Sequence, residues 1–257
     1  MGAEFIDYIV ADHALIPEAS REYYKEKIIY MPGSYQPNDR KRAISDIRPS
    51  KKDLNINEEA FVFGCFINSF KILPDIFRVW MNILESVPNS VLLLLDTSEY
   101  AKTNIREEVE RCGINRNRII FCPFLPHAEH LARYCIIDLF LDTLPYNAHT
   151  TASDALWSGV PVLTCVGETF ASRVGASLLH AVGMSELITT NMDDYKNRAI
   201  GIASSPGEIR RLKYKLENNL PDCALFNTEA YVRNIEEAYI KISDIYHMGM
   251  PTEHIFL

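Results

Sequence analysis

Polar and charged side chains gather in four short stretches of this sequence, and each stretch directly follows a run of apolar residues. The stretches are INSFK (67–71), PFLPHAEHLAR (123–133), DTLPYNAHTTASD (142–154) and VGETFASR (166–173). Together they supply cations, amides, histidines and hydroxyls, which are groups that bind phosphate oxygens. This set favours a site that neutralises a diphosphate without a metal ion. A nucleotide is the natural carrier of such a diphosphate.

The stretch with His149, Thr150 and Thr151 can be explained in two ways. In the first, Thr151 is the N-cap of a helix and Asp154 completes a capping box, which would stabilise the helix by about 1 kcal/mol. In the second, His149, Thr150 and the free N–H groups of the first helical turn bind an anion at the positive end of the helix dipole. The spacing alone leaves both explanations open.

The other candidate residues also have simpler explanations. Lys71 follows an apolar run, where a lysine is often only a solvated surface charge. His130 and Arg133 are three residues apart, which places both side chains on one face of a helix and toward one cleft. Such pairs are usually surface residues, so spacing alone does not make them ligands.

The sequence gives little support for a metal site, for two common nucleotide-binding motifs or for a catalytic nucleophile. His127 and His130 have the spacing of two zinc ligands, but no third ligand is close in sequence. There is no GxGxxG and no GxxxxGK[ST] motif, which disfavours an NAD-type dehydrogenase and a P-loop NTPase. No GxSxG or Cys/His motif supports nucleophilic catalysis.

The elements that would position these residues begin at Phe61, where strand-like and helical patterns start to alternate. Strands are predicted at 61–66, 91–95, 118–122, 137–141 and 161–165, and helices at 73–87, 103–112, 127–135, after the HTT run, at 172–183, and from 193 to the end of the chain. Strands that are apolar on both faces and alternate with helices predict a doubly wound, Rossmann-like parallel α/β sheet. In such sheets ligands bind beyond the carboxyl ends of the strands, where the polar stretches lie.

The first 58 residues do not show this alternation of strand-like and helical patterns. Two strand-like runs, 5–12 and 28–32, flank a helix candidate at 17–27, and these elements cannot bury themselves. Residues 1–35 are therefore expected to be the remnant of another lobe, from which the chain would have been truncated. Residues 36–58 have too few apolar side chains for a core and are expected to be a linker, which leaves 59–257 as the main lobe with its terminal helices.

The amino-acid composition limits the kinds of molecule that this protein is expected to bind. With 34 acidic and 26 basic residues the formal charge is −8, so no general surface field would attract nucleic acid or an anionic membrane. Six scattered cysteines without a CxxC pair are expected to be reduced, as in a cytoplasmic protein. The longest apolar run, SVLLLLD, is far shorter than the roughly 20 residues of a membrane span and is expected to be a buried strand.

Four motifs, in this order, resemble the C-terminal catalytic lobe of the protein O-GlcNAc transferases and their SPINDLY-like relatives. They are PNSVLLLL, NRIIFCPFLPHAEHL, LDTLPYNAHTTASDALWSGVPVLT and VGETFASRVGASLL, and the resemblance spans about 61–248. It implies one lobe of a GT-B glycosyltransferase, an inverting and metal-independent enzyme that transfers GlcNAc from UDP-GlcNAc to Ser or Thr of acceptor proteins and needs no cofactor. In this family the acid-base groups lie in an N-terminal lobe, usually preceded by tetratricopeptide repeats, so this chain alone is expected to bind donor with little transfer.

The resemblance also implies roles for residues at the diphosphate. The phosphate-contacting amide and lysine of the family correspond to Asn68 and Lys71, and Lys71 would offset the charge of the leaving group. The HTT motif that surrounds the diphosphate corresponds to His149, Thr150 and Thr151.

Further roles are implied at the base and the ribose. The residues that correspond to the base site are Phe124 and Leu125, through their backbone, and His130 and Arg133. Asp154 corresponds to the acidic residue near the ribose, and His127 replaces a lysine that commonly contacts the ribose, which bears on nucleotide affinity or donor choice.

Relatives in this family use UDP-GlcNAc, GDP-fucose or UDP-glucose. The intact HTT and the GETFASR run favour the UDP-GlcNAc members. The alternatives are a related transferase for GDP-fucose or UDP-glucose, and a non-catalytic module that binds nucleotide sugars or other proteins.

Overall fold

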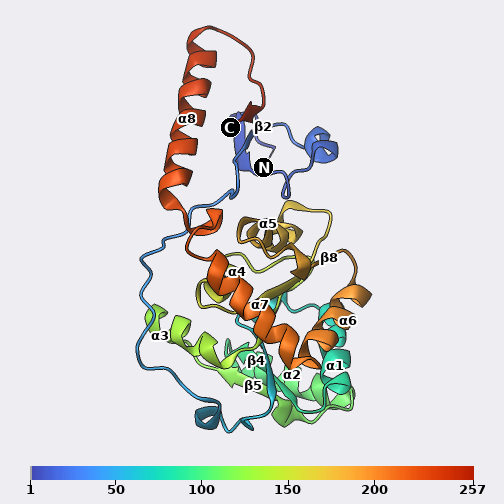
Figure 1. Ribbon diagram of the computed structural model, residues 1–257. Helices are drawn as coiled ribbons and strands as arrows, with labels where there is room; N and C mark the ends of the chain where they lie inside the picture. Colours follow the sequence, from blue (N-terminus) through green and yellow to red (C-terminus); the bar gives the residue numbers. More distant parts are fainter. Residues whose placement is uncertain (1) are drawn as a thin grey trace.

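A six-stranded parallel sheet forms the centre of the computed structural model, which describes residues 2–257 (Figure 1). Its strands are β3 (Phe61–Cys65), β4 (Ser90–Leu95), β5 (Ile119–Cys122), β6 (Leu139–Leu141), β7 (Val162–Cys165) and β8 (Ile188–Thr189), in the spatial order β5-β4-β3-β6-β7-β8. The chain builds the sheet outward from β3 in one direction and then returns to place β6 on the other side of β3. The predicted doubly wound sheet is confirmed, and its topological switch point lies between β3 and β6.

Helices connect the strands and follow the last of them. They are α1 (Pro74–Ser86), α2 (Glu99–Arg111), α3 (His127–Ala132), α4 (Thr150–Trp157), α5 (Val174–Ala181), α6 (Met192–Ala203), α7 (Pro206–Asn219) and α8 (Thr228–His247). Local sequence sets several of their starts: α1 has proline at its first position, and Ser98 accepts a hydrogen bond from the N–H of Ala101 at the start of α2. None of the helices in residues 2–257 is long and apolar enough to cross a membrane.

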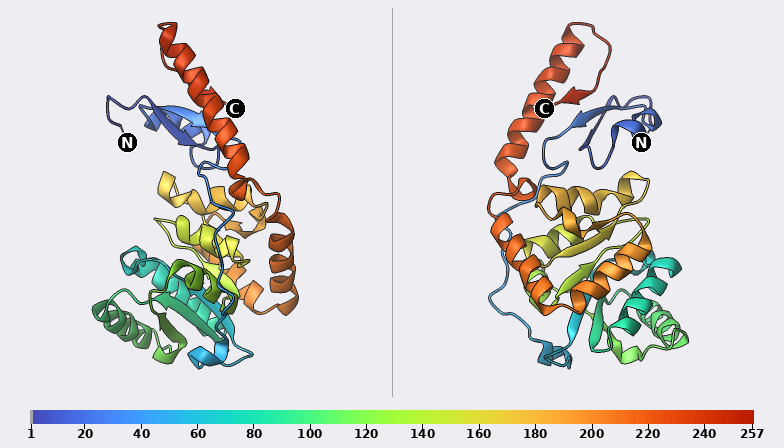
Figure 2. Two further views of the ribbon diagram at one scale, coloured as in Figure 1. Left: turned by 90° about the vertical axis from the view of Figure 1, so that its left-hand side faces the viewer. Right: turned by 45° about the vertical axis from the view of Figure 1, so that its right-hand side comes forward.

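The two ends of the chain meet in a second, smaller sheet. It has the order β1-β2-β9, with β1 (Tyr8–Ala11), β2 (Lys27–Tyr30) and β9 (Ile255–Phe256), all parallel. Figure 2 shows this sheet and α8 standing together at one end of the molecule. Apolar side chains join them, from Ile29, Met31 and Ile255 on the strand side and Ile235, Ala238 and Ile242 on the helix.

Two expectations for these end segments are wrong. The chain does not stay helical to its end, because β9 adds an edge strand to β2. The helix expected at 17–27 is a short 3-10 helix, Glu18–Tyr23, that has no buried residue to extend it against a core. The boundaries 1–35, 36–58 and 59–257 stay a prediction.

Residues 36–58, here called the strap, run along one side of the large sheet's lobe (Figure 1). The strap is fixed to that lobe at several points. Arg40 donates a hydrogen bond to the Pro221 carbonyl at 3.1 Å, and Asn38 accepts one from the Ser153 hydroxyl at 2.6 Å. Ile56 is buried in the main core. The segment is poor in apolar residues, as expected, but it is bound to the lobe along its length.

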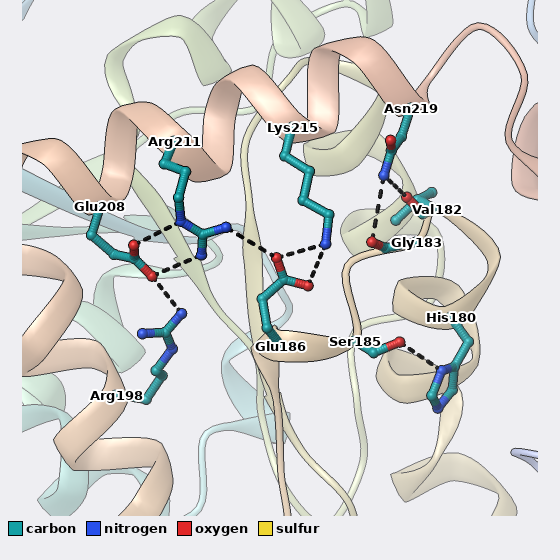
Figure 3. Close-up of polar contacts among 10 residues, drawn as sticks. All are labelled: His180, Val182, Gly183, Ser185, Glu186, Arg198, Glu208, Arg211, Lys215 and Asn219. Carbon is teal, nitrogen blue, oxygen red and sulfur yellow. Dashed lines mark hydrogen bonds and ion pairs between the residues drawn. The ribbon is translucent and has the colours of Figure 1, made fainter.

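Ion pairs join α6 and α7 to the segment just before β8 (Figure 3). Glu208 accepts hydrogen bonds from Arg198 at 2.7 Å and Arg211 at 2.9 Å, while Glu186 contacts Lys215 at 2.7 Å. The two arginines hold the pKa of Glu208 at about 2, below its ordinary 4.5. These contacts hold the outer helices on the sheet.

Candidate functional site

A cavity of about 340 Å³ opens beside the carboxyl ends of β3, β4 and β5, next to the switch point of the sheet. Most of the residues predicted for the site line it: Asn68, Lys71, Phe124, Leu125, His127, His130, Arg133 and Thr151. His149, Thr150 and Asp154 are not part of its lining and lie on or next to α4, whose second residue is Thr151. The structure therefore brings residues from three polar stretches together at one edge of the sheet.

At one end of the cavity, the buried Arg133 pairs with the half-buried His130. Arg133 is only 4% exposed, so the explanation as a surface pair is wrong for it. Its guanidinium donates to the Pro123 carbonyl at 2.5 Å and to Nδ1 of His130, and it lies 4.3 Å from the centre of the Phe66 ring. Arginine has no acceptor, so Nδ1 of His130 must be unprotonated and Nε2 carries the hydrogen.

Burial and the neighbouring cation keep His130 neutral. Desolvation is the main cause, and Arg133 and then His127 add to it, so that the pKa of His130 falls to about 4. A neutral histidine with an available N–H, next to the exposed Phe124, suits an uncharged polar ring such as a nucleobase.

At the other end of the cavity, Lys71 supplies a partly buried cation. It ends a short 3-10 helix, Ser69–Lys71, in the segment that follows β3. Its Nζ lies 3.9 Å from the centre of the Tyr146 ring and 3.5 Å from the Asn147 carbonyl. Burial lowers the pKa of Lys71, while the nearby Asp142 carboxylate opposes that shift. A cation in this half-buried place interacts with an anion more strongly than one on the open surface.

The loop from Asp142 to His149 is folded around a buried carboxylate that the sequence analysis did not single out. Asp142 is 1% exposed, and its Oδ1 accepts hydrogen bonds from the N–H groups of Thr143 at 2.7 Å and Ala148 at 2.6 Å. Its Oδ2 accepts one from the Thr164 hydroxyl at 2.6 Å. Burial nevertheless raises the pKa of Asp142 to about 7. The only signal in the sequence that could have marked Asp142 as a site residue was its position directly after a strand predicted to be buried.

This loop places two rings beside Lys71. Tyr146 stacks on His149 with ring centres 4.8 Å apart, and the buried Asn147 accepts a hydrogen bond from the N–H of Gly175 at 3.1 Å. Burial lowers the pKa of His149. Tyr146 and Asn147 were not predicted as site residues, although both lie inside the motif that carried the prediction.

The capping box predicted for α4 does not form. The helix begins at Thr150 with His149 as its N-cap, two residues earlier than expected, and no side chain caps it. Asp154 does not reach back to the helix start because its carboxylate pairs with Arg42 of the strap at 2.5 Å. Thr151 lines the cavity instead. The first turn of α4 therefore keeps its N–H groups free of side-chain caps, as the anion-binding explanation requires.

No three histidine, cysteine or carboxylate side chains within residues 2–257 are grouped as they would be to hold a metal ion. Nε2 of His127, which lines the cavity, lies 3.8 Å from Oδ1 of Asp154, and the His127 side chain is 56% exposed.

Comparison with known proteins places this geometry in a family. The pattern of glycosyl transferase family 41 matches residues 43–235. The chain belongs to this family. The family resemblance inferred from the four motifs is thereby confirmed.

Two curated proteins are similar to most of this chain. It is 33% identical to the probable UDP-N-acetylglucosamine–peptide N-acetylglucosaminyltransferase SEC of Arabidopsis thaliana, over 98% of this chain and 26% of that protein. It is 32% identical to the UDP-N-acetylglucosamine–peptide N-acetylglucosaminyltransferase of Caenorhabditis elegans, over 80% of this chain and 18% of that protein. The chain thus spans about a quarter or less of the length of these relatives.

A solved structure has the same fold as this chain. A mutant of the Thermobaculum terrenum O-GlcNAc transferase superposes with a TM-score of 0.78 at 30% identity, over 91% of this chain and 44% of that one. The predicted Rossmann-like lobe of GT-B type is confirmed.

Proposed function

We propose that this chain is the nucleotide-sugar-binding part of a protein O-linked N-acetylglucosaminyltransferase. The complete enzyme would transfer GlcNAc from UDP-GlcNAc to Ser or Thr of acceptor proteins in the cytoplasm, with inversion and without a metal ion. Its N-terminal lobe and tetratricopeptide repeats would lie outside this chain, so the chain alone would bind donor and transfer it poorly. The names of the two curated relatives support the choice of donor and acceptor.

One observation carries the proposal most directly. Lys71 and the uncapped start of α4 lie at the same edge of one cavity, on the two sides of the switch point. When a sugar leaves UDP, negative charge grows on the terminal phosphate. A lysine and free helix N–H groups fixed at that position would stabilise the departing diphosphate more than the bound donor, which lowers the barrier to transfer.

The opposite end of the cavity suits the base. The exposed Phe124 and Leu125 line it together with the neutral His130. This arrangement supports a nucleoside as the ligand because it offers hydrogen-bonding groups and apolar contact.

Substitution of Lys71 by alanine tests the proposal. A hydrogen bond to a charged group contributes about 1.5–3 kcal/mol, so Lys71→Ala is expected to weaken UDP binding by about ten- to a hundred-fold. Isothermal titration calorimetry measures this, with the exposed strap residue Lys52, changed to alanine, as the matched control. Equal UDP affinity in wild type and Lys71→Ala would count against the assignment.

A second candidate is a related transferase for GDP-fucose or UDP-glucose, or a non-catalytic module that binds the same nucleotides. His127 favours it, because this exposed residue lines the cavity at the position where the family resemblance implies a lysine. The nucleotide preference of the wild-type chain separates these candidates.

A further inference from the structure

A buried ion pair joins the strap to the edge of the cavity. A guanidinium nitrogen of Arg42, Nη1, lies 2.5 Å from Oδ1 of Asp154, and the two side chains are only 12% and 8% exposed. They lie 112 residues apart in sequence. The same carboxylate oxygen, Oδ1, is 3.8 Å from Nε2 of His127, which lines the cavity. The other oxygen, Oδ2, makes no hydrogen bond with any residue in 2–257.

Arg42 is held in place by contacts that do not involve Asp154. Its guanidinium lies 5.6 Å from the Trp157 ring and 5.5 Å from the Phe226 ring. Its carbonyl accepts a hydrogen bond from Nε1 of Trp157 at 3.2 Å, and its Nε donates to the Asp39 carbonyl at 3.1 Å. The guanidinium is thus fixed before it meets the carboxylate, and little side-chain entropy is lost in forming the pair.

The pair also sets the charge state of Asp154. Burial raises the pKa of this carboxyl group, and Arg42, followed by His127, acts in the opposite direction. Without Arg42, a nearly buried carboxylate would face only the more exposed His127, and it would bind a proton more readily. A protonated carboxyl group is a weaker acceptor than a carboxylate.

We infer that Arg42 is a positioning residue for nucleotide recognition: it engages Oδ1 of Asp154, so that Oδ2 accepts a hydrogen bond from a ribose hydroxyl. The inference rests on the proposed function, in which a nucleotide fills the cavity. Asp154 contacts His127, which lines that cavity, and the family resemblance assigns the ribose to Asp154. It assigns a role in ligand selection to the strap, which local sequence reasoning treated as a linker.

The test compares UDP with 2′,3′-dideoxy-UDP, which lacks the ribose hydroxyls, by calorimetry on the complete 257-residue chain. Wild type is expected to prefer UDP by about ten-fold or more. Arg42→Met keeps the packing on Trp157 and Phe226 but removes charge and donors. It is expected to lose most of that preference while its affinity for the dideoxy nucleotide stays unchanged. Arg42→Lys should restore part of the preference, and Arg40→Ala, on the same strap, should leave it intact.

The outcomes separate the inference from the proposed function. If Arg42→Met weakens binding of both nucleotides equally, Arg42 is only structural and the inference is wrong. If Arg42→Met does not fold, Asp154→Asn measures the same coupling from the other partner, and an undiminished preference for UDP there overturns the inference. If wild type binds UDP without preference over the dideoxy form, the inference fails and the proposed function stands. If wild type binds neither UDP nor the dideoxy nucleotide, the inference and the proposed function both fail.

Discussion

The buried carboxylate of Asp142 should make the protein less stable as the pH rises. Its pKa is about 7 in the folded protein, against 3.8 for an ordinary aspartate, because burial outweighs its hydrogen bonds. The folded state therefore binds the proton more tightly than the unfolded state does. The stability contribution is fully present below pH 3.8 and is lost as the pH rises through about 7. A difference of about 3 pH units at about 1.36 kcal/mol per unit sets an upper magnitude of about 4 kcal/mol.

Asp142→Asn removes this penalty and keeps the shape of the side chain. The amide oxygen can still accept from the N–H groups of Thr143 and Ala148, and the Thr164 hydroxyl can turn to accept from the amide N–H. The variant should be more stable than wild type at pH 8, by about 1–4 kcal/mol, and no more stable at pH 4.

Urea unfolding followed by circular dichroism from pH 4 to pH 9 measures this difference, with Asp46→Asn on the exposed part of the strap as control. A variant that is less stable than wild type by the same amount at every pH would refute the reasoning, because the loss would then come from hydrogen bonds alone.

Two further predictions concern packing and surface charge. Gly175→Ala should destabilise the fold by about 1–3 kcal/mol, because its Cβ would overlap with Asp142 and Thr164. Gly201→Ala should instead stabilise it by about 0.5–1 kcal/mol, because Gly201 lies in the last turn of α6 and its added Cβ would meet no neighbouring atom. Thermal unfolding of both variants checks this, and equal effects would contradict it. Glu208→Gln should lower the free energy of unfolding at pH 7 by about 1 kcal/mol or less, since the ion pairs of Glu208 with Arg198 and Arg211 are near the surface. Because the folded pKa of Glu208 is about 2, wild type should lose its stability advantage over the variant as the pH falls from 4.5 toward 2. A stability difference that persists at pH 2 would point to a cause other than charge.

The main sheet could be predicted because its signals are local. Each strand from β3 to β7 is a short apolar run between turn residues, and the helical patterns between the runs require parallel connections. Once the strands are parallel, the polar stretches that follow them must meet at one edge. This is why most of the predicted site residues line one cavity.

The parts that sequence reasoning missed depend on contacts between distant residues. The capping rule that joined Thr151 to Asp154 failed because Arg42, far away in the chain, takes the carboxylate. The strand β9 has only two residues, and it exists because Ile255 pairs with Ile29 at the other end of the chain. The burial of Asp142 likewise comes from the packing of β6 against β7 and α5, which no local pattern contains.

The nucleotide preference of the wild-type chain tests the central claim most directly. Calorimetric titration with UDP, UDP-GlcNAc, GDP and GDP-fucose, at one pH and salt concentration, compares the four ligands on the same cavity. The proposed function predicts that the chain binds UDP and UDP-GlcNAc and that it binds the guanine nucleotides at least ten-fold more weakly. Tighter binding of GDP or GDP-fucose, or no binding of any of the four, would contradict it.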